Sequence, residues 1–95
     1  MNEDLLKFFE ALMSGQPVRS DVVGNDVVGD YTIDTCHTID CGYETAINKN
    51  NGFWVVVQRY KDREMAEKGH KIWCGICAGA PEKVYSVQTG KYEEF

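Results

Sequence analysis

The sequence predicts an α+β fold in which an antiparallel β-meander of three or four strands carries one helix from the C-terminal half of the chain. Short segments of alternating apolar and polar residues predict the strands, and the turn sequences Asp40-Cys41-Gly42 and Asn50-Asn51-Gly52 separate them. Apolar residues at helical spacing after Asp62 predict the helix. With 95 residues the chain should form a single domain, residues 1–95, that is marginally stable alone.

The first expected element is an amphipathic N-terminal helix from Asp4 to Met13 that stops at Gly15. Its apolar residues are Leu5, Leu6, Phe9, Leu12 and Met13. The next stretch, residues 21–30, repeats Val-Val-Gly around Gly24-Asn25, and both of these residues tolerate a positive φ. We interpret this stretch as a short hairpin or an irregular crossing.

Three strands should follow in close succession. They are expected over Tyr31–Ile39, Tyr43–Asn48 and Phe53–Tyr60. The last of them has apolar residues on both faces, with Phe53, Val55 and Val57 on one and Trp54, Val56 and Tyr60 on the other. Each face of the sheet therefore needs a cover.

Asp62 is the expected N-cap of the main helix, which should end near Gly79-Ala80-Pro81. Its predicted apolar stripe is Met65, Gly69, Trp73, Ile76 and Ala80. This stripe would cover one sheet face, and the N-terminal helix or a second copy of the protein would cover the other. Val84–Thr89 is typical of a last short strand, and residues 90–95 are expected to form a frayed end.

The composition argues against several kinds of partner. Ten Lys and Arg residues against fifteen Asp and Glu residues give a net charge of −5, so nucleic acid is not an expected ligand. No apolar run approaches the roughly 18 residues of a membrane span. The start Met1-Asn2-Glu3-Asp4 lacks the basic region of a signal peptide. We expect an intracellular protein whose thiols stay reduced.

The segment Trp73-Cys74-Gly75-Ile76-Cys77 has the W-C-G-x-C form of the thiol–disulfide oxidoreductases. That chemistry needs its first cysteine at a helix N-terminus, where the helix dipole lowers the pKa of the thiol. Here the motif falls near the C-terminal end of the predicted helix, and few residues follow it. The sequence therefore argues against a redox enzyme, and no catalytic residue is assigned.

The four cysteines are also candidate zinc ligands, because Cys36 with Cys41 and Cys74 with Cys77 form two close pairs. In the simpler interpretation they are free thiols that pack as small hydrophobic groups, and the protein has no cofactor. His70 precedes Cys74 by one helical turn and could be a base beside a nucleophile. A histidine that bridges helix and sheet is the favoured interpretation.

Two groups of residues resemble small proteins of tailed bacteriophages and prophages. They are Asp34-Thr35 with Gly42-Tyr43-Glu44-Thr45-Ala46-Ile47, and Ala66-Glu67-Lys68-Gly69-His70 with Trp73. The similarity spans roughly Tyr31 to Trp73, and the cysteines are not part of the shared pattern. That group has no assigned activity. The resemblance implies a phage or prophage context, a meander-plus-helix fold, and a location in the host cytoplasm or in the virion.

We expect a non-enzymatic interaction protein that contacts another protein or forms a homo-oligomer. Its candidate contact residues are Leu5, Phe9, Leu12, Trp54, Val56 and Tyr60. Two alternatives remain open. One is a structural zinc module held by the four cysteines. The other is an acidic decoy of a host nucleic-acid-binding enzyme, with a carboxylate cluster drawn from Asp21, Asp26, Asp30, Asp34 and Asp40.

Overall fold

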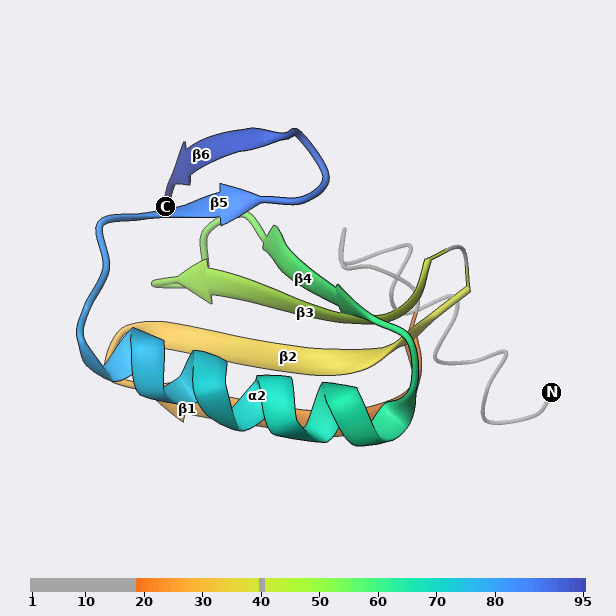
Figure 1. The fold of residues 1–95 in the computed structure, drawn as a ribbon. Helices are drawn as coiled ribbons and strands as arrows, with labels where there is room; N and C mark the ends of the chain where they lie inside the picture. The colour runs from red at the N-terminus through yellow and green to blue at the C-terminus, as the bar shows by residue number, and fades with distance from the viewer. Residues whose placement is uncertain (1–18, 40) are drawn as a thin grey trace, which may run out of the picture.

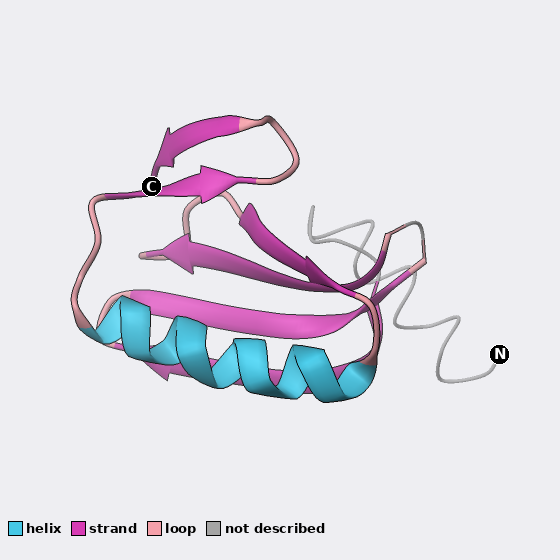
Figure 2. Ribbon diagram, viewed as in Figure 1, coloured by secondary structure: helices cyan, strands magenta, loops and turns pink. Residues whose placement is uncertain are grey.

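A four-stranded antiparallel sheet forms the body of the fold, with the strands in the order β1-β2-β3-β4 (Figure 1). One helix lies across one face of this sheet, and a small two-stranded hairpin follows it (Figure 2). The elements are β1 Arg19–Val28, β2 Tyr31–Thr38, β3 Gly42–Lys49, β4 Val55–Tyr60, α2 Arg63–Ala78, β5 Lys83–Ser86 and β6 Lys91–Glu94. The predicted α+β fold, with its meander and packed helix, is confirmed.

The computed structural model describes residues 19–39 and 41–95. The helix predicted over Asp4–Met13 lies outside the described residues, and so does Asp40.

The predicted turn before the last meander strand is confirmed. Asn50 and Asn51 have φ values of 53° and 59°, and the Gly52 N–H donates to the Lys49 carbonyl over 3.0 Å. Asparagine enters this left-handed region more readily than most residues, because its short polar side chain can bond to the local backbone. The turn sequence therefore fixes where β3 ends.

The turn predicted at Gly24-Asn25 is wrong. Strand β1 runs through both residues, and they pair with Thr35 and Asp34 of β2. The chain reverses later, at Gly29, which has a φ of 59°. Gly24 serves close packing instead, since a Cβ at this position would come within 2.5 Å of the His70 ring.

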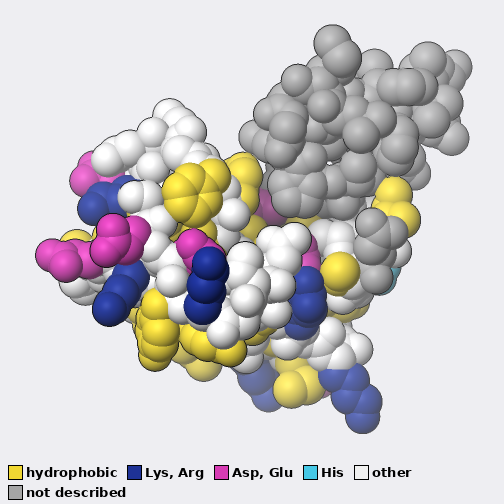
Figure 3. Space-filling model, turned by 90° about the horizontal axis from the view of Figure 1, so that it is seen from above, with side chains coloured by type: hydrophobic (Ala, Val, Ile, Leu, Met, Phe, Trp, Pro, Cys, Tyr) yellow, Lys and Arg dark blue, Asp and Glu magenta, His cyan; other side chains and the backbone are white. Residues whose placement is uncertain are grey.

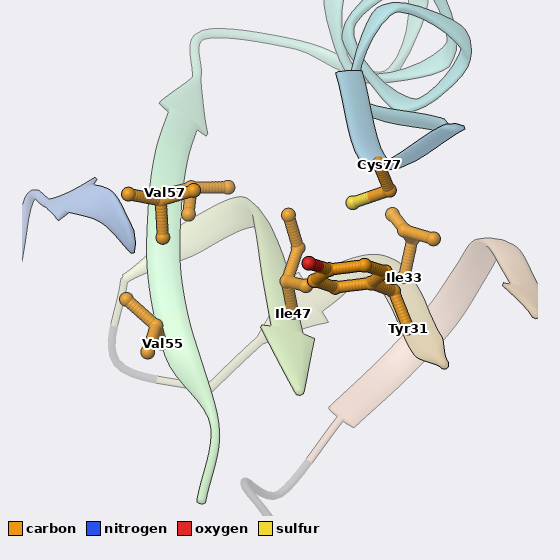
Figure 4. Packing of buried hydrophobic residues seen from close by; sticks show 7 residues of the cluster. Tyr31, Ile33, Ile47, Val55, Val57 and Cys77 are labelled. Atoms are coloured by element: carbon orange, nitrogen blue, oxygen red, sulfur yellow. The ribbon is translucent and has the colours of Figure 1, made fainter. Parts of the chain in front are cut away.

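The apolar core lies between α2 and the sheet face beneath it. It comprises Tyr31, Ile33, Ile47, Val55, Val57, Cys77 and Val84. In Figure 4 the side chain of Cys77 projects from the helix toward Ile33 and Tyr31. Cysteine here fills space as a small apolar group, as the simpler interpretation of the thiols predicted.

The C-terminal residues also contribute to this core. The Tyr31 hydroxyl donates to the Pro81 carbonyl, and its ring meets that of Phe95 edge to face, with centroids 5.4 Å apart. Strand β6 pairs with β5, so the predicted frayed end over 90–95 is wrong. The strand predicted to reach Thr89 stops at Ser86, because its hydroxyl accepts the N–H groups of the next turn.

Helix α2 begins as predicted, with Asp62 as N-cap accepting the Met65 N–H over 2.9 Å. Its predicted apolar stripe is partly wrong, because Met65, Ile76 and Ala80 are exposed. The side that contacts the sheet carries Ala66, Gly69, His70 and Cys77, with Trp73 half-buried. A residue without a side chain is needed at position 69, because the Tyr60 ring occupies the space beside Gly69. Among the described residues no helix is both long and apolar enough to cross a membrane.

The predicted division of β4 into two faces is also partly wrong. A register shift opposite Thr45 and Ala46 interrupts the alternation of side chains. Tyr60 consequently points toward α2, as Val55 and Val57 do, while Val56 pairs with Ala46. The irregularity brings the Tyr60 hydroxyl under the helix.

Candidate functional site

A chain of buried hydrogen bonds connects α2 to the middle of the sheet. His70 Nδ1 lies 2.6 Å from Thr35 Oγ1, which lies 2.6 Å from Thr45 Oγ1, and that oxygen lies 2.8 Å from the Tyr60 hydroxyl. At the other end His70 Nε2 lies 2.7 Å from Asp26 Oδ2. One direction of donation satisfies every member: Tyr60 to Thr45, Thr45 to Thr35, Thr35 to Nδ1, and Nε2–H to Asp26.

Local structure places each member of this chain. Thr35 and Thr45 are direct partners across β2 and β3, and both are fully buried. Thr35 points to the helix because it alternates with Tyr31 and Ile33, as the sequence predicted. His70 lies on the buried side of α2 and bridges helix and sheet, which confirms the favoured interpretation of this residue.

The Asp26 end of this hydrogen-bond chain is exposed to solvent and lies beside the thiol of Cys74. Asp26, His70 and Cys74 each offer one ligand atom, and the three atoms lie within 4.8 Å of one another. His70 is buried, Cys74 is half-buried and Asp26 is exposed. We call these three residues the Asp-His-Cys cluster. It joins β1 to the helix and has one face accessible from outside.

The two thiols of the W-C-G-x-C motif are not activated. Burial, and to a smaller extent the Asp26 carboxylate, raise the pKa of the Cys74 thiol above its usual range. Burial raises the pKa of Cys77 to about 11. Both residues lie in the second half of α2, away from its N-terminus. This placement is the opposite of what a nucleophilic thiolate requires.

The four predicted zinc ligands lie in different places. Cys36 is buried on β2, and Cys41 is exposed in the turn between β2 and β3. That turn lies at the opposite end of the sheet from the C-terminal end of α2 (Figure 1), where Cys77 faces the core. Within the described part of the chain, Cys74 is the one cysteine that joins a group of three potential metal ligands.

The predicted contact residues are divided as well. Leu5, Phe9 and Leu12 lie outside the described residues. Val56 and Tyr60 are buried within the fold, and Trp54 is half-buried.

Three of the predicted surface carboxylates already have partners within the chain. Asp21 accepts from Tyr43 and Arg63, and Asp26 bonds to His70. Asp34 is buried and accepts from the Asn25 amide over 2.7 Å. Asp30 is exposed. The three paired carboxylates thus interact with different parts of the fold. The acidic-decoy alternative stays a prediction.

A different apolar surface is exposed on α2. Met65, Ile72 and Ile76 have exposed fractions of 50%, 62% and 40%. On a helix of 3.6 residues per turn these positions fall within about 40° of one another. They lie beside the buried side of the helix, where Trp73 donates to Gln58 of β4 over 2.8 Å. We call these three residues the α2 flank.

Seen from above, over the C-terminal hairpin, the surface is mixed (Figure 3). Hydrophobic side chains lie there among acidic and basic ones. Tyr85 and Tyr92 are exposed and stack edge to face with centroids 5.5 Å apart, and the Lys83 ammonium lies over the Tyr92 ring. These two rings contact each other, whereas the three side chains of the α2 flank form a row along one helix.

Sequence reasoning missed Asp26 and Thr35 as partners of His70. The one-turn spacing of His70 and Cys74 is visible in the sequence. The position of Asp26 depends on the continuation of β1 through Gly24, and the assumed turn hid that continuation.

Comparisons with protein-family models, with curated proteins and with solved structures found no match to this chain.

Proposed function

We propose that this protein is a non-enzymatic interaction protein that associates with a second copy of itself through the α2 flank. The observation that carries the proposal is the row of exposed apolar side chains Met65, Ile72 and Ile76. The proposal includes the phage or prophage context implied by the motif resemblance, in which a virion component or a host-directed factor would use such a contact.

The spacing of the flank suits a two-fold axis. If two α2 helices pair antiparallel about residues 70 and 71, Met65 of one copy faces Ile76 of the other. The two Ile72 side chains then meet near the axis, about 4.5 Å apart along the helix direction. Such an isologous contact closes after two copies.

The helix dipoles favour the same arrangement. Antiparallel pairing of two α2 helices sets the N-terminal end of each dipole beside the C-terminal end of the other. The charged side chains of the first half do not oppose it, because they already pair within the helix, Arg63 with Glu67 and Lys68 with Glu64.

Sedimentation of the full chain over a wide concentration range tests this proposal. Ile72→Lys should weaken self-association at least tenfold, because an apolar contact near the axis is lost in both copies. Val27→Lys is the matched control, since Val27 is 72% exposed on β1 and lies away from the flank. A wild-type protein that stays monomeric at its highest soluble concentration would overturn the proposal, and so would equal weakening by both variants.

Cross-linking tests the orientation of the two copies. In a Cys41→Ser background, Ile72→Cys should form an intermolecular disulfide readily, because the paired residues meet at the axis. Met65→Cys should not, because antiparallel pairing separates the two copies of residue 65. Faster cross-linking through residue 65 would contradict the antiparallel arrangement.

A further inference from the structure

The Asp-His-Cys cluster brings together three different metal-ligating groups from two elements. Asp26 comes from β1, and His70 and Cys74 lie one turn apart on α2. A carboxylate oxygen, an imidazole nitrogen and a thiolate sulfur are the three donors that zinc uses in proteins. We propose that this cluster binds a divalent transition-metal ion of the zinc type, with a fourth position open to solvent.

The distances are close to those that such an ion needs. Metal bonds of about 2.0 Å to nitrogen and oxygen and about 2.3 Å to sulfur separate tetrahedral ligand atoms by roughly 3.3 to 3.5 Å. The His70 and Asp26 atoms lie 2.7 Å apart, and all three ligand atoms lie within 4.8 Å. A small outward movement of the exposed Asp26 would lengthen its distance to His70, and a rotation of the Cys74 side chain would bring its sulfur nearer, so that the three ligand atoms reach these separations.

The hydroxyl chain behind His70 supports the ligand. A histidine that binds metal through Nε2 carries its proton on Nδ1 and donates it to a neighbouring acceptor. Thr35 Oγ1 stands at this place, 2.6 Å from Nδ1. Hydroxyl groups can rotate, so the chain can reverse: Nδ1–H donates to Thr35, Thr35 to Thr45, and Thr45 to the oxygen of Tyr60. The ring therefore keeps a partner with and without a metal ion.

The chemistry of the three groups favours a cation as well. The Asp26 carboxylate oxygen lies in the same group of ligand atoms as the Cys74 sulfur, all within 4.8 Å of one another. A bound dication would be attracted by the carboxylate and would deprotonate the thiol that it binds. The site opens through Asp26, so an ion has an entry path from solvent.

Titration of the untagged, reduced full chain with Co²⁺ tests the proposal, since cobalt reports a thiolate ligand by a charge-transfer band in the near ultraviolet. The wild type should develop this band at one equivalent, and Zn²⁺ should displace it. Cys74→Ser should abolish the band. Asp26→Asn should weaken Co²⁺ binding by at least tenfold. Cys41→Ser is the matched control and should leave both unchanged, because Cys41 is exposed in the β2–β3 turn.

Two outcomes would overturn the assignment. Loss of the band in both Cys74→Ser and Cys41→Ser would show that the ion is held by the four cysteines instead. Absence of the band in a folded wild type would show that the cluster does not bind through its thiol. Circular dichroism of each variant checks that the fold is retained. Self-association is measured separately, because the cluster and the α2 flank share no residue.

Discussion

Gly24 lies directly against the imidazole ring of His70. A Cβ at residue 24 would come within 2.5 Å of Nε2 and 2.6 Å of Cδ2. The backbone of an edge strand and a buried ring of the helix are thus in contact without any intervening side chain. This close approach sets the height of α2 above β1.

Gly24→Ala should lower the free energy of unfolding by about 1 to 3 kcal/mol, the usual cost of forcing an extra methyl group into a packed site. Urea denaturation monitored by tryptophan fluorescence measures this change. The effect should largely vanish in a His70→Ala background, where the removed ring leaves room for the methyl group. An equal loss in both backgrounds would mean that the ring is not the obstacle.

Two glycines of α2 allow a matched comparison of one substitution. A Cβ at Gly69 would overlap the Tyr60 ring, whereas a Cβ at Gly75 meets nothing within 4 Å. Gly75→Ala should stabilise the protein by about 0.5 to 1 kcal/mol through helix propensity. Gly69→Ala should destabilise it by about 1 to 3 kcal/mol, because the ring or the helix must shift. Changes of the same sign in thermal melts would contradict this packing.

Thr35 links His70 to Thr45, so the loss of its hydroxyl should be costly. Thr35→Val keeps the shape of the side chain but leaves Nδ1 of His70 and the Thr45 hydroxyl short of a buried partner. We expect a loss of about 1 to 3 kcal/mol in the free energy of unfolding.

Thr32→Val provides the control for this prediction. Thr32 lies on the same strand but is only half-buried and points to the opposite sheet face. The substitution at residue 32 should change stability little in the same urea titration. An equal loss in the free energy of unfolding for both variants would show that the hydrogen bonds of the Thr35 hydroxyl do not stabilise the fold.

The buried Cys77 thiol makes stability depend on alkaline pH. Its pKa rises from an ordinary value of 9.0 to about 11 in the folded protein. The folded state therefore holds this proton more tightly than the unfolded state. This tighter binding of the Cys77 proton contributes to the free energy of unfolding, by an amount of the order of 2 to 3 kcal/mol. The contribution is fully present below the pKa of the unfolded state and is lost as pH rises through the pKa of the folded state.

The measurement is urea denaturation at a series of pH values across this interval. Burial also raises the pKa of Tyr60, which adds a decline of the same sign. The Cys77→Ala variant isolates the thiol, because its stability should fall less steeply with pH than that of the wild type. Parallel slopes for the two proteins would contradict the assignment.

Features encoded by a few neighbouring residues were predictable. The turn at Asn50-Asn51-Gly52 and the N-cap at Asp62 depend on local backbone conformation and local hydrogen bonds, and both are present. The alternation that turns Thr35 inward with Tyr31 and Ile33 was also visible. These signals were sufficient for the meander and the helix.

Features fixed by distant contacts were not predictable in the same way. The sequence offers two apolar sides of α2, one with Met65 and Ile76 and one with Ala66 and Cys77. Contacts with distant residues select the second side: the Tyr60 ring, turned toward the helix by the irregularity in β4, packs beside Gly69, and His70 bonds to Thr35. Likewise the role of Gly24 depends on a ring far along the chain, and the cluster around His70 could not be assembled while β1 was interpreted as a hairpin.

Strand β1 forms one edge of the four-stranded sheet, and its register with β2 shifts twice, between Ser20 and Val22 and between Val22 and Gly24. Such irregularities break the even spacing of backbone donors and acceptors that an incoming strand would need. This half of β1 is therefore a poor template for cross-β growth. Val22, which is exposed on this half of the strand, is therefore protected from edge-to-edge pairing by backbone geometry rather than by charge.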